Sequence, residues 1–185
     1  MTRIGLDLSI NSTGIVIDTG KQTYYYIITS TATKKMKAFG DKRVNVIIYN
    51  KQKSQKNDDY ATKEKSKSAN IILVSKILHE ILSKHKENSI AFIEGISYGS
   101  IGSAAIADLS GLNFIVRYVL DSLGIPFIIV SPMANKKFAC GIGNADKDVM
   151  INAWEKCQPK MVGLKDLLKV DDIADAYFLS HSNIS

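Results

Sequence analysis

One acidic residue lies within an otherwise apolar run near the start of the chain, residues 3–8. Turn-forming residues follow at 9–14, and a second apolar run occupies residues 15–17. Because strand side chains alternate between faces, a strand here would place Asp7 on the same face as Gly5, opposite the larger apolar side chains. A carboxylate in such surroundings is costly unless it is paired. Asp7 is therefore either satisfied by a nearby amide or lysine, or part of a site to which other acids contribute.

The first thirty residues predict three strands in an antiparallel meander. Residues 18–21 have the composition of a hairpin turn, and residues 23–29 are rich in aromatic and β-branched side chains, which favour strands. Short turns between successive strands make the neighbouring strands antiparallel. We therefore expect residues 3–8, 15–17 and 23–29 to form one side of a sheet.

Residues 34–67 form a basic insertion in which lysine and arginine far outnumber aspartate and glutamate. The apolar patch at residues 44–49 has the composition of a short strand, and the remainder is predicted to be a loop. Two interpretations stay open for this segment: a solvated insertion, or a segment that contacts phosphates.

Helix and strand patterns alternate after the insertion. Apolar residues at helical spacing predict a helix over 68–86 with Ser68 as its N-cap, and residues 89–94 predict a buried strand that ends in Glu94. A helix between two strands is typical of a crossover that makes them parallel. Further elements are predicted as helices at 104–123, 145–157 and 170–181, a strand at 126–130 and a loop at 131–144.

These elements predict the α/β fold class, with a five-stranded mixed sheet flanked by helices. The first three strands are expected to be antiparallel and the others parallel. A chain of 185 residues is most simply one domain, so residues 1–185 are interpreted as a single domain that contains the basic insertion.

Composition limits the class of protein further. No apolar run approaches the roughly 20 residues of a membrane helix, and the first strand begins too early to leave room for a signal peptide. Cys140 and Cys157 are too few for a disulfide framework and lack the spacing of a metal site, which is typical of reduced thiols in a cytoplasmic, intracellular protein. The net charge of +6 favours a polyanionic partner and gives no indication of a membrane.

Acidic residues recur at three places that a fold of this class could bring together. Asp7 lies in the first strand, and Glu94 ends the strand after the crossover. In the final helix, Asp172 and Asp175 are three residues apart and therefore share a face, whereas Asp171 points elsewhere and is suited to an N-cap.

Such an arrangement suits magnesium, which prefers oxygen ligands and usually takes one or two carboxylates with substrate phosphate. Two ions about 4 Å apart can activate water and stabilise the leaving oxygen in phosphodiester cleavage. The alternative is that Asp172 and Asp175 are ordinary acids at a helix start, where negative charge is favoured anyway. We interpret Asp7, Glu94, Asp172 and Asp175 as a metal site because they lie in the first strand, at the end of a neighbouring strand and on one face of a covering helix.

Several short motifs occur in a characteristic order along most of the chain. They are Ile4-Gly5-Leu6-Asp7 followed by Thr13-Gly14, then Ile93-Glu94, the stretch 131–137, the pattern G-x-G-x-A-x-K at 141–147, and Asp172-Ile173-Ala174-Asp175-Ala176. This ordered set resembles the motifs of RuvC-type Holliday junction resolvases, whose fold is ribonuclease H-like.

The resemblance implies a homodimer that hydrolyses paired strands of a four-way DNA junction with two Mg²⁺ ions, for which Mn²⁺ can substitute. Asp7, Glu94, Asp172 and Asp175 match the metal-binding acids of the family, and Lys147 matches a basic residue near the scissile phosphate. A second basic residue matches either Lys136 or Lys137. The family also has an aromatic wedge shortly after the second acid, for which Tyr98 is the candidate.

Two departures and two rival functions remain. The basic insertion is longer and more basic than the corresponding bacterial segment, and the loop after Glu94 lacks close identity, so the preferred DNA sequence and junction selectivity are left open. One rival is a catalytically silent DNA-binding module. The other is an actin-like or sugar-kinase-like ATPase fragment, because the turn after Asp7 resembles a phosphate loop, although that architecture needs two such domains.

Overall fold

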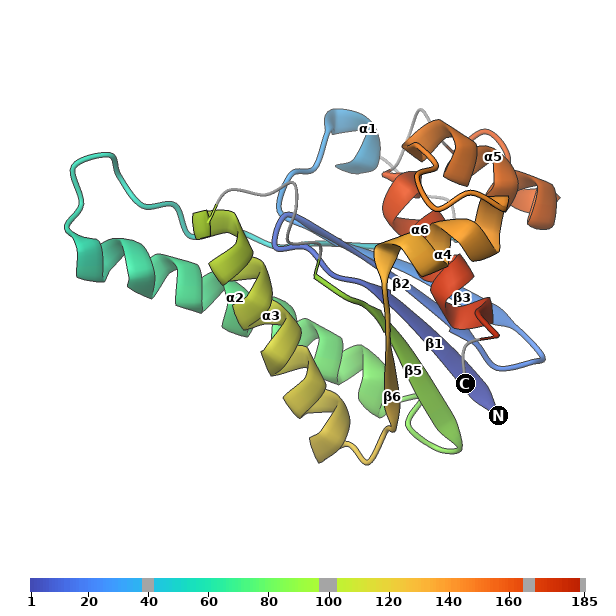
Figure 1. Cartoon of the computed structure of the whole chain (residues 1–185). Helices are drawn as coiled ribbons and strands as arrows, with labels where there is room; N and C mark the ends of the chain where they lie inside the picture. Colours follow the sequence, from blue (N-terminus) through green and yellow to red (C-terminus); the bar gives the residue numbers. More distant parts are fainter. Residues whose placement is uncertain (38–41, 97–102, 165–168, 184–185) are drawn as a thin grey trace.

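A mixed six-stranded sheet lies at the centre of the computed structural model, with helices on both faces (Figure 1). The structure describes residues 1–37, 42–96, 103–164 and 169–183. The strand order across the sheet is β4-β3-β2-β1-β5-β6. The strands are β1 Thr2–Asp7, β2 Ser12–Asp18, β3 Thr23–Thr29, β4 Asn45–Ile48, β5 Ser89–Glu94 and β6 Phe127–Val130.

The predicted meander is confirmed, because β1 pairs antiparallel with β2 and β2 with β3. The parallel half is confirmed as well, because β5 lies parallel to both β1 and β6. The prediction of five strands is wrong. The apolar patch in the basic insertion forms β4, which adds a sixth strand parallel to β3, with Tyr26 opposite Asn45 and Thr29 opposite Ile48. Buried Val44 and Tyr49 on either side of β4 fix this short edge strand to the core.

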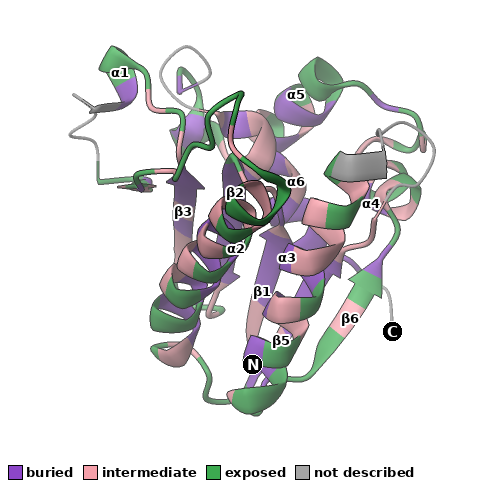
Figure 2. Cartoon of the chain, turned by 90° about the vertical axis from the view of Figure 1, so that its left-hand side faces the viewer, coloured by how far each residue is buried: buried purple, intermediate pink, exposed green. Residues whose placement is uncertain are grey.

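The helices are divided between the two faces of the sheet. The long helices α2 (Tyr60–Ser83) and α3 (Ser103–Ser122) pack against each other on one face, with their exposed sides turned outward (Figure 2). The other face carries α4 (Pro132–Cys140), α5 (Lys147–Cys157) and α6 (Val170–His181), and α6 contacts β1 and β2 directly. Two short elements complete the described chain, α1 (Lys34–Lys37) and the 3-10 helix η1 (Pro159–Met161).

Strand alternation divides the core into two layers. Ile4 and Leu6 of β1 pack with residues of α2 and α3, such as Leu78 and Leu112. On the opposite face, the strand residues lie against α5 and α6, where Trp154 is fully buried. Asp7 and Gly5 belong to this second face by their register, as the sequence pattern predicts.

Helix α2 begins eight residues earlier than expected. Asp59 rather than Ser68 is its N-cap, and the Asp59 carboxylate accepts a hydrogen bond from the Thr62 N–H at 2.6 Å. The last part of the basic insertion is therefore helix and not loop. In Figure 1 this end of α2, with the segment before it, projects from the body of the molecule. We call residues 51–67 the basic arm.

The predicted loop at 131–144 is also wrong over most of its length, because residues 132–140 form α4. Ser131 caps this helix by accepting from the Ala134 N–H, and Pro132 occupies its first turn, where its missing N–H costs nothing. Gly141, with φ of 78°, ends it in the left-handed conformation that glycine adopts readily. Helix α5 likewise starts two residues later than expected, because Asp146 is its N-cap. No helix among the described residues has the length and apolarity needed to cross a membrane.

Candidate active site

Two glycines allow the backbone of α6 to lie directly on the sheet. A Cβ atom added to Gly5 would lie 1.8 Å from the Ala176 carbonyl oxygen, and one added to Gly14 would lie 2.1 Å from the Asp172 carbonyl oxygen. Any larger residue at either position would therefore push the helix away. This close contact places Asp172 and Asp175 next to the carboxyl end of β1, where Asp7 lies opposite Gly14.

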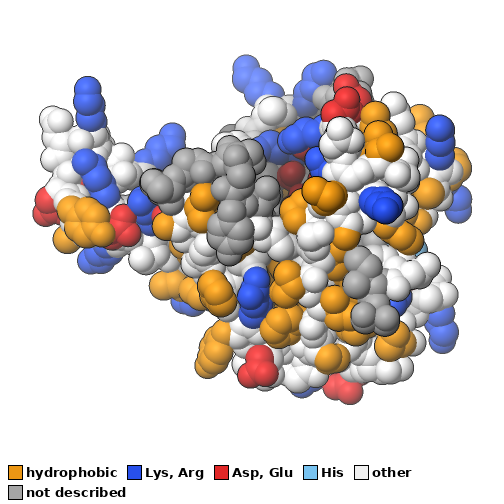
Figure 3. Space-filling model, in the orientation of Figure 1, with side chains coloured by type: hydrophobic (Ala, Val, Ile, Leu, Met, Phe, Trp, Pro, Cys, Tyr) orange, Lys and Arg blue, Asp and Glu red, His pale blue; other side chains and the backbone are white. Residues whose placement is uncertain are grey.

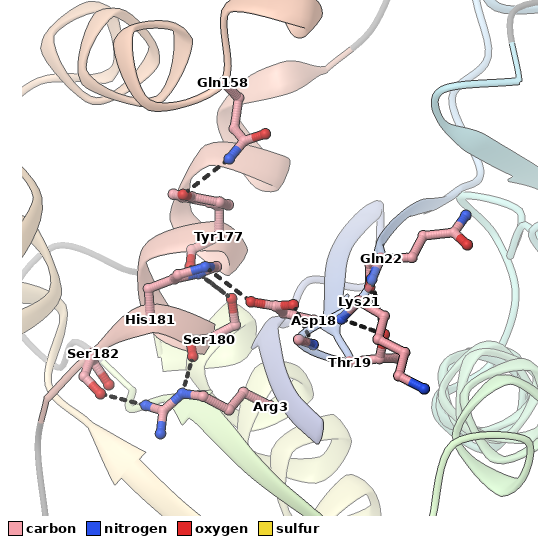
Figure 4. Close-up of polar contacts among 11 residues, drawn as sticks. Arg3, Asp18, Thr19, Lys21, Gln22, Gln158, Tyr177, Ser180, His181 and Ser182 are labelled. Carbon is pink, nitrogen blue, oxygen red and sulfur yellow. Dashed lines mark hydrogen bonds and ion pairs between the residues drawn. The ribbon is translucent and has the colours of Figure 1, made fainter. Parts of the chain in front are cut away.

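The far end of α6 is anchored by a separate polar network (Figure 4). The Arg3 guanidinium lies over the Phe92 ring and donates to the carbonyl oxygens of Ser180 at 2.6 Å and Ser182 at 2.5 Å. His181 Nε2 lies 3.2 Å from the Asp18 carboxylate at the end of β2. These contacts fix the register of α6 along the first two strands, and so support the position of its acids at the other end.

Acidic residues from three elements meet at the carboxyl end of β1. The parallel register pairs Leu6 with Ile93, so Glu94 follows at the level of Asp7. Glu94 and Asp175 line a cavity of about 290 Å³, which we call the acidic cavity. Asp7 and Asp172 are not among its described lining residues, although both lie in the same acidic group. Figure 3 shows an acidic side chain within a hollow bordered by lysine or arginine side chains.

Burial and neighbouring negative charge raise the pKa of the acids. Burial raises the pKa of Asp7 well above its usual value, and the charges of Glu94, Asp175 and Asp172 raise it further. Burial and then the Asp175 charge raise the pKa of Glu94 to about 7, although Lys136 opposes the rise. These two causes indicate acids near one another in a poorly solvated site, which is where functional acids are concentrated.

The two acids of α6 are held differently. Burial raises the pKa of each to about 6. Asp172 accepts a hydrogen bond from the Ser12 hydroxyl at the start of β2, which opposes the rise. Asp175 Oδ1 is buried without a hydrogen-bond partner, although Lys136 and Lys147 lower its pKa by charge. An uncompensated carboxylate oxygen is costly in a purely structural role and suits an oxygen that receives a cation.

The structure separates the three predicted lysines. Lys136 and Lys147 both line the acidic cavity, one on α4 and the other at the start of α5. Lys137 is exposed and is not among the described lining residues. The geometry therefore favours Lys136 over Lys137 as the residue near the acids. Tyr98, the candidate wedge, lies outside the described residues.

Lys147 contacts an acid that the sequence analysis had assigned to helix capping. Its ammonium lies 2.5 Å from the Asp171 carboxylate, in a pair whose lysine side chain is 78% exposed. Asp171 is not an N-cap, because α6 begins at Val170 and Lys169 holds the cap position. The Lys147 side chain therefore reaches Asp171 from the solvent side, while the Asp171 side chain is only 22% exposed.

Two buried asparagines that support the acidic group were not predicted from the sequence. Asn113 of α3 donates its amide to the Glu94 carbonyl oxygen, and Asn135 of α4 donates to the Asp175 carbonyl oxygen, both at 3.2 Å. Asn113 is 1% exposed and Asn135 is fully buried. Each one fixes the backbone of an acid. A polar residue at an apolar position of a predicted helix can indicate such a role. Asn113 has this pattern in the predicted helix 104–123. Asn135 does not, because residues 131–144 were predicted to be a loop.

The donor chemistry of the acidic group fits a divalent cation. The acidic group contains four carboxylates with raised pKa, and one of them has a buried oxygen without a hydrogen-bond partner. Such an oxygen-rich set is what Mg²⁺ prefers. Within the described ranges, however, no three His, Cys, Asp or Glu side chains are grouped closely enough to hold a metal ion as they stand. The acidic group therefore fits a divalent cation in the type of its donor atoms, its charge and its burial.

Comparisons with known proteins identify the fold. The chain is similar to the structure of Thermus thermophilus RuvC, with a TM-score of 0.57 and 14% identity over 97% of this chain and 91% of that one. The T. thermophilus RuvC structure in complex with Holliday junction substrate gives a TM-score of 0.59 and 14% identity over 97% and 90%. The yeast mitochondrial Holliday junction resolvase Ydc2 gives a TM-score of 0.50 and 14% identity over 96% and 75%.

No protein-family model matches the sequence, and a search of curated proteins gave no match. The resemblance to RuvC-type resolvases is confirmed at the level of the fold, since the structural likeness covers nearly the whole chain.

Proposed function

We propose that this protein is a Mg²⁺-dependent endonuclease that cuts branched DNA, with the four-way junction as its principal substrate. The observation that carries the proposal is the meeting of acids from β1, β5 and α6 beside Lys136 and Lys147, on the fold of RuvC resolvases. One of the similar structures contains a Holliday junction substrate, which supports branched DNA as the partner. The basic net charge agrees with such a partner.

In this proposal Asp7, Glu94, Asp172 and Asp175 hold the metal. Two Mg²⁺ ions bound there would activate water and stabilise the leaving oxygen of a phosphodiester. The chain itself provides the frame: Gly5 and Gly14 bring α6 onto β1, while Asn113 and Asn135 hold the backbone of two of the acids. Such rigid support is what keeps reacting groups in a productive geometry.

Lys136 and Lys147 would bind the phosphate that approaches the acids. Both line the acidic cavity, and both lower the pKa of Asp175 by their charge. Positive groups at this place offset the negative charge that accumulates on the phosphate oxygens during cleavage. In this proposal Lys147, whose side chain is largely exposed, would leave Asp171 as it takes the phosphate.

A homodimer is the assembly that fits this function, since two strands of a junction must be cut in a concerted manner. Light scattering coupled to gel filtration, with and without junction DNA, measures this state directly. A protein that stays a monomer even on DNA would contradict the dimer proposal. A cytoplasmic location with access to DNA follows from the proposed activity and is part of the same proposal.

The test is incubation with end-labelled four-way junction, fork, flap and plain duplex of matched sequence, with and without divalent metal. We expect Mg²⁺ or Mn²⁺ to support cleavage of the junction in preference to duplex. Ca²⁺ should support binding with little cutting, because its looser coordination orients the attacking water less well.

Two outcomes would contradict the proposal. Cleavage in EDTA at the same rate as in Mg²⁺ would contradict the metal-dependent mechanism. Tight junction binding with no cleavage in any metal would instead favour a catalytically silent DNA-binding module.

A further inference from the structure

A chain of polar contacts connects the outer part of α3 to the acidic cavity. The Arg117 Nε–H donates to Asn113 Oδ1 at 2.8 Å, and the Asn113 amide donates in turn to the Glu94 carbonyl oxygen at 3.2 Å. Asn113 and Glu94 line the acidic cavity, whereas Arg117 is not among its described lining residues. A residue outside the cavity is therefore joined by two hydrogen bonds to the backbone of a proposed metal ligand.

The Asn113 amide can satisfy both contacts in one orientation only. A guanidinium N–H donates and never accepts, so the amide oxygen must face Arg117. A backbone carbonyl oxygen accepts and never donates, so the amide nitrogen must face Glu94. If the amide turned over, two donors would meet on one side and two acceptors on the other. Because Asn113 is only 1% exposed, water has little access with which to compensate such a mismatch.

Arg117 is suited to fix this orientation because its own position is restrained. Arg117 follows Asn113 by four residues on α3, so the two side chains lie on the same side of the helix. The Arg117 guanidinium carbon lies 4.8 Å from the centroid of the Phe114 ring, where the face of the ring attracts a cation. Arginine stays protonated in proteins, so the direction of the hydrogen bond to Asn113 does not change with pH.

We propose that Arg117 is a positioning residue for Glu94 and that it acts through the Asn113 amide. The inference rests on the proposed nuclease function, in which Glu94 holds metal, and it adds a residue to the support of that site. Arg117 keeps the buried amide turned so that it donates to the Glu94 backbone. The carboxylate at the end of β5 is thereby held at a defined place in the acidic cavity. Partners that orient a metal ligand from outside strongly affect metal binding.

The test removes the contacts one at a time. Arg117→Met keeps an unbranched side chain without a donor, whereas Arg117→Lys keeps a donor and the charge. Asn113→Leu keeps the shape of the side chain but can neither accept nor donate. Phe114→Leu removes only the ring beside the guanidinium. Tyr118→Leu is its matched control, because Phe114 and Tyr118 are 62% and 72% exposed on the same helix. Melting temperatures establish that each variant is folded.

The first readout is single-turnover cleavage of a four-way junction over a range of Mg²⁺ concentrations. We expect Arg117→Met and Asn113→Leu each to raise the Mg²⁺ concentration for half-maximal rate about tenfold, as is typical when a metal ligand loses an orienting partner. Arg117→Lys should restore most of this loss. Phe114→Leu should cause a smaller loss and Tyr118→Leu none.

The double variant tests whether Arg117 acts through the amide. Arg117→Met combined with Asn113→Leu should be no worse than Asn113→Leu alone, because residues that act in one chain of contacts are not additive. Losses that multiply in the double variant would overturn the proposal. Normal Mg²⁺ dependence of Arg117→Met would overturn it as well.

A spectroscopic measurement on the metal-free protein separates this inference from the proposed function. In proton–nitrogen correlation spectra, the Asn113 side-chain amide and the Gly95 backbone amide, which shares a peptide unit with the Glu94 carbonyl, both report the contact. We expect Arg117→Met to shift both signals, and Arg117→Lys and Tyr118→Leu to leave them in place. If no DNA is cut in any metal while these shifts are seen, the nuclease proposal fails and the positioning of Glu94 stands. If the unaltered protein cuts junctions and Arg117→Met changes neither the signals nor the cleavage, the positioning fails and the nuclease proposal stands.

Discussion

Burial and charge act on Asp7 in the same direction. Burial and all of its acidic neighbours raise its pKa. A carboxyl group with a raised pKa binds its proton more tightly in the folded chain than in the unfolded chain. Its contribution to stability is therefore largest below its unfolded pKa and is lost as pH rises through the folded pKa. In metal-free protein the acidic group thus opposes folding near neutral pH.

We expect Asp7→Asn to stabilise the metal-free protein at pH 7.5 and to abolish cleavage. Removing the charge relieves first the cost of burying it and then the repulsion with Glu94 and Asp175. For a chain of this size, about 1 kcal/mol corresponds to a rise of about 2–4 °C in melting temperature. The gain over the unaltered protein should shrink from pH 7.5 to pH 5, because Glu94 and Asp175, with pKa near 7 and 6, become protonated over that range. Thermal melting in EDTA at several pH values measures this, and an equal gain at both pH values would contradict it.

Asp172→Asn and Asp175→Asn are each expected to lower cleavage at least a hundredfold while junction binding stays equal or becomes tighter. Each change removes a proposed metal ligand and one negative charge near phosphate. Asp121→Asn is the matched control, because Asp121 is exposed near the far end of α3. Single-turnover cleavage in Mg²⁺ and affinity without metal are the measurements. Normal cleavage by both variants would place the metal elsewhere.

Asp171→Asn is expected to retain most cleavage, although the reason differs from the one that the sequence suggested. Asp171 was expected to cap α6, where asparagine serves equally well, but it pairs with Lys147 instead. The substitution frees Lys147 for phosphate and leaves the four proposed ligands in place. The same cleavage assay decides the matter, and a reduction of activity comparable to that of Asp172→Asn would make Asp171 part of the metal site.

At this scale the sequence predicted the acids but not their supports. Asp7 was predicted from strand alternation, Glu94 from its place at the end of a strand, and Asp172 and Asp175 from helical spacing. All of these are properties of neighbouring residues. Ser12 and Asn135 contact α6 from 160 and 40 residues away, and no local pattern reports such contacts. The choice between Lys136 and Lys137 was open for the same reason, since it depends on the face that α4 turns to the cavity.

At the scale of elements, the contact between α6 and the sheet determines the site. Gly5→Ala is expected to destabilise the protein by about 3 kcal/mol or more and to lower cleavage, because the new Cβ meets backbone that cannot move independently. Gly111→Ala is the control, since the nearest atom is a side-chain methyl of Ile71 at 3.3 Å and alanine favours helix. Denaturant unfolding measures both variants. A tolerated Gly5→Ala would mean that α6 does not lie this close to β1.

Element boundaries were predicted well where the apolar or β-branched pattern was clear. The final helix has the predicted bounds 170–181, and residues 23–29 form β3 as expected. Helix α4 was missed although Ser131-Pro132 and Gly141 mark its ends, because a nine-residue helix offers few apolar repeats. The sequence did not determine whether β4 joins the sheet. This strand has four residues and pairs only with β3, and such pairing is not visible in the sequence of one strand.

At the scale of the whole molecule, the basic arm extends the surface that DNA can touch. The arm carries more lysines than acids, and its Tyr60 is 80% exposed. A segment that projects from the body in this way can follow one arm of a junction while the acidic cavity engages the branch. Solvated lysines remain the alternative, and salt dependence distinguishes the two.

Lys56→Gln with Lys65→Gln should weaken junction binding and flatten its salt dependence. Removing one lysine–phosphate interaction reduces the slope of log affinity against log salt by about 0.9. Lys84→Gln with Lys86→Gln is the control, because these exposed lysines follow the other end of α2 and carry the same charge. Affinities at several salt concentrations measure the slope. Equal slopes for the two double variants would mean that the basic arm is a solvated insertion that does not contact phosphates.

The position of α6 along the chain has a consequence for biosynthesis. Ribosomes make Asp7 and Glu94 long before they reach Val170, so a nascent chain has β1 and β5 but only half of the acidic group. Until α6 emerges and settles on Gly5 and Gly14, the sheet also lacks the helix that covers β1 and β2. Under the proposed function, translation that stops early would release fragments that lack two of the four proposed metal ligands, and such fragments would not cut DNA.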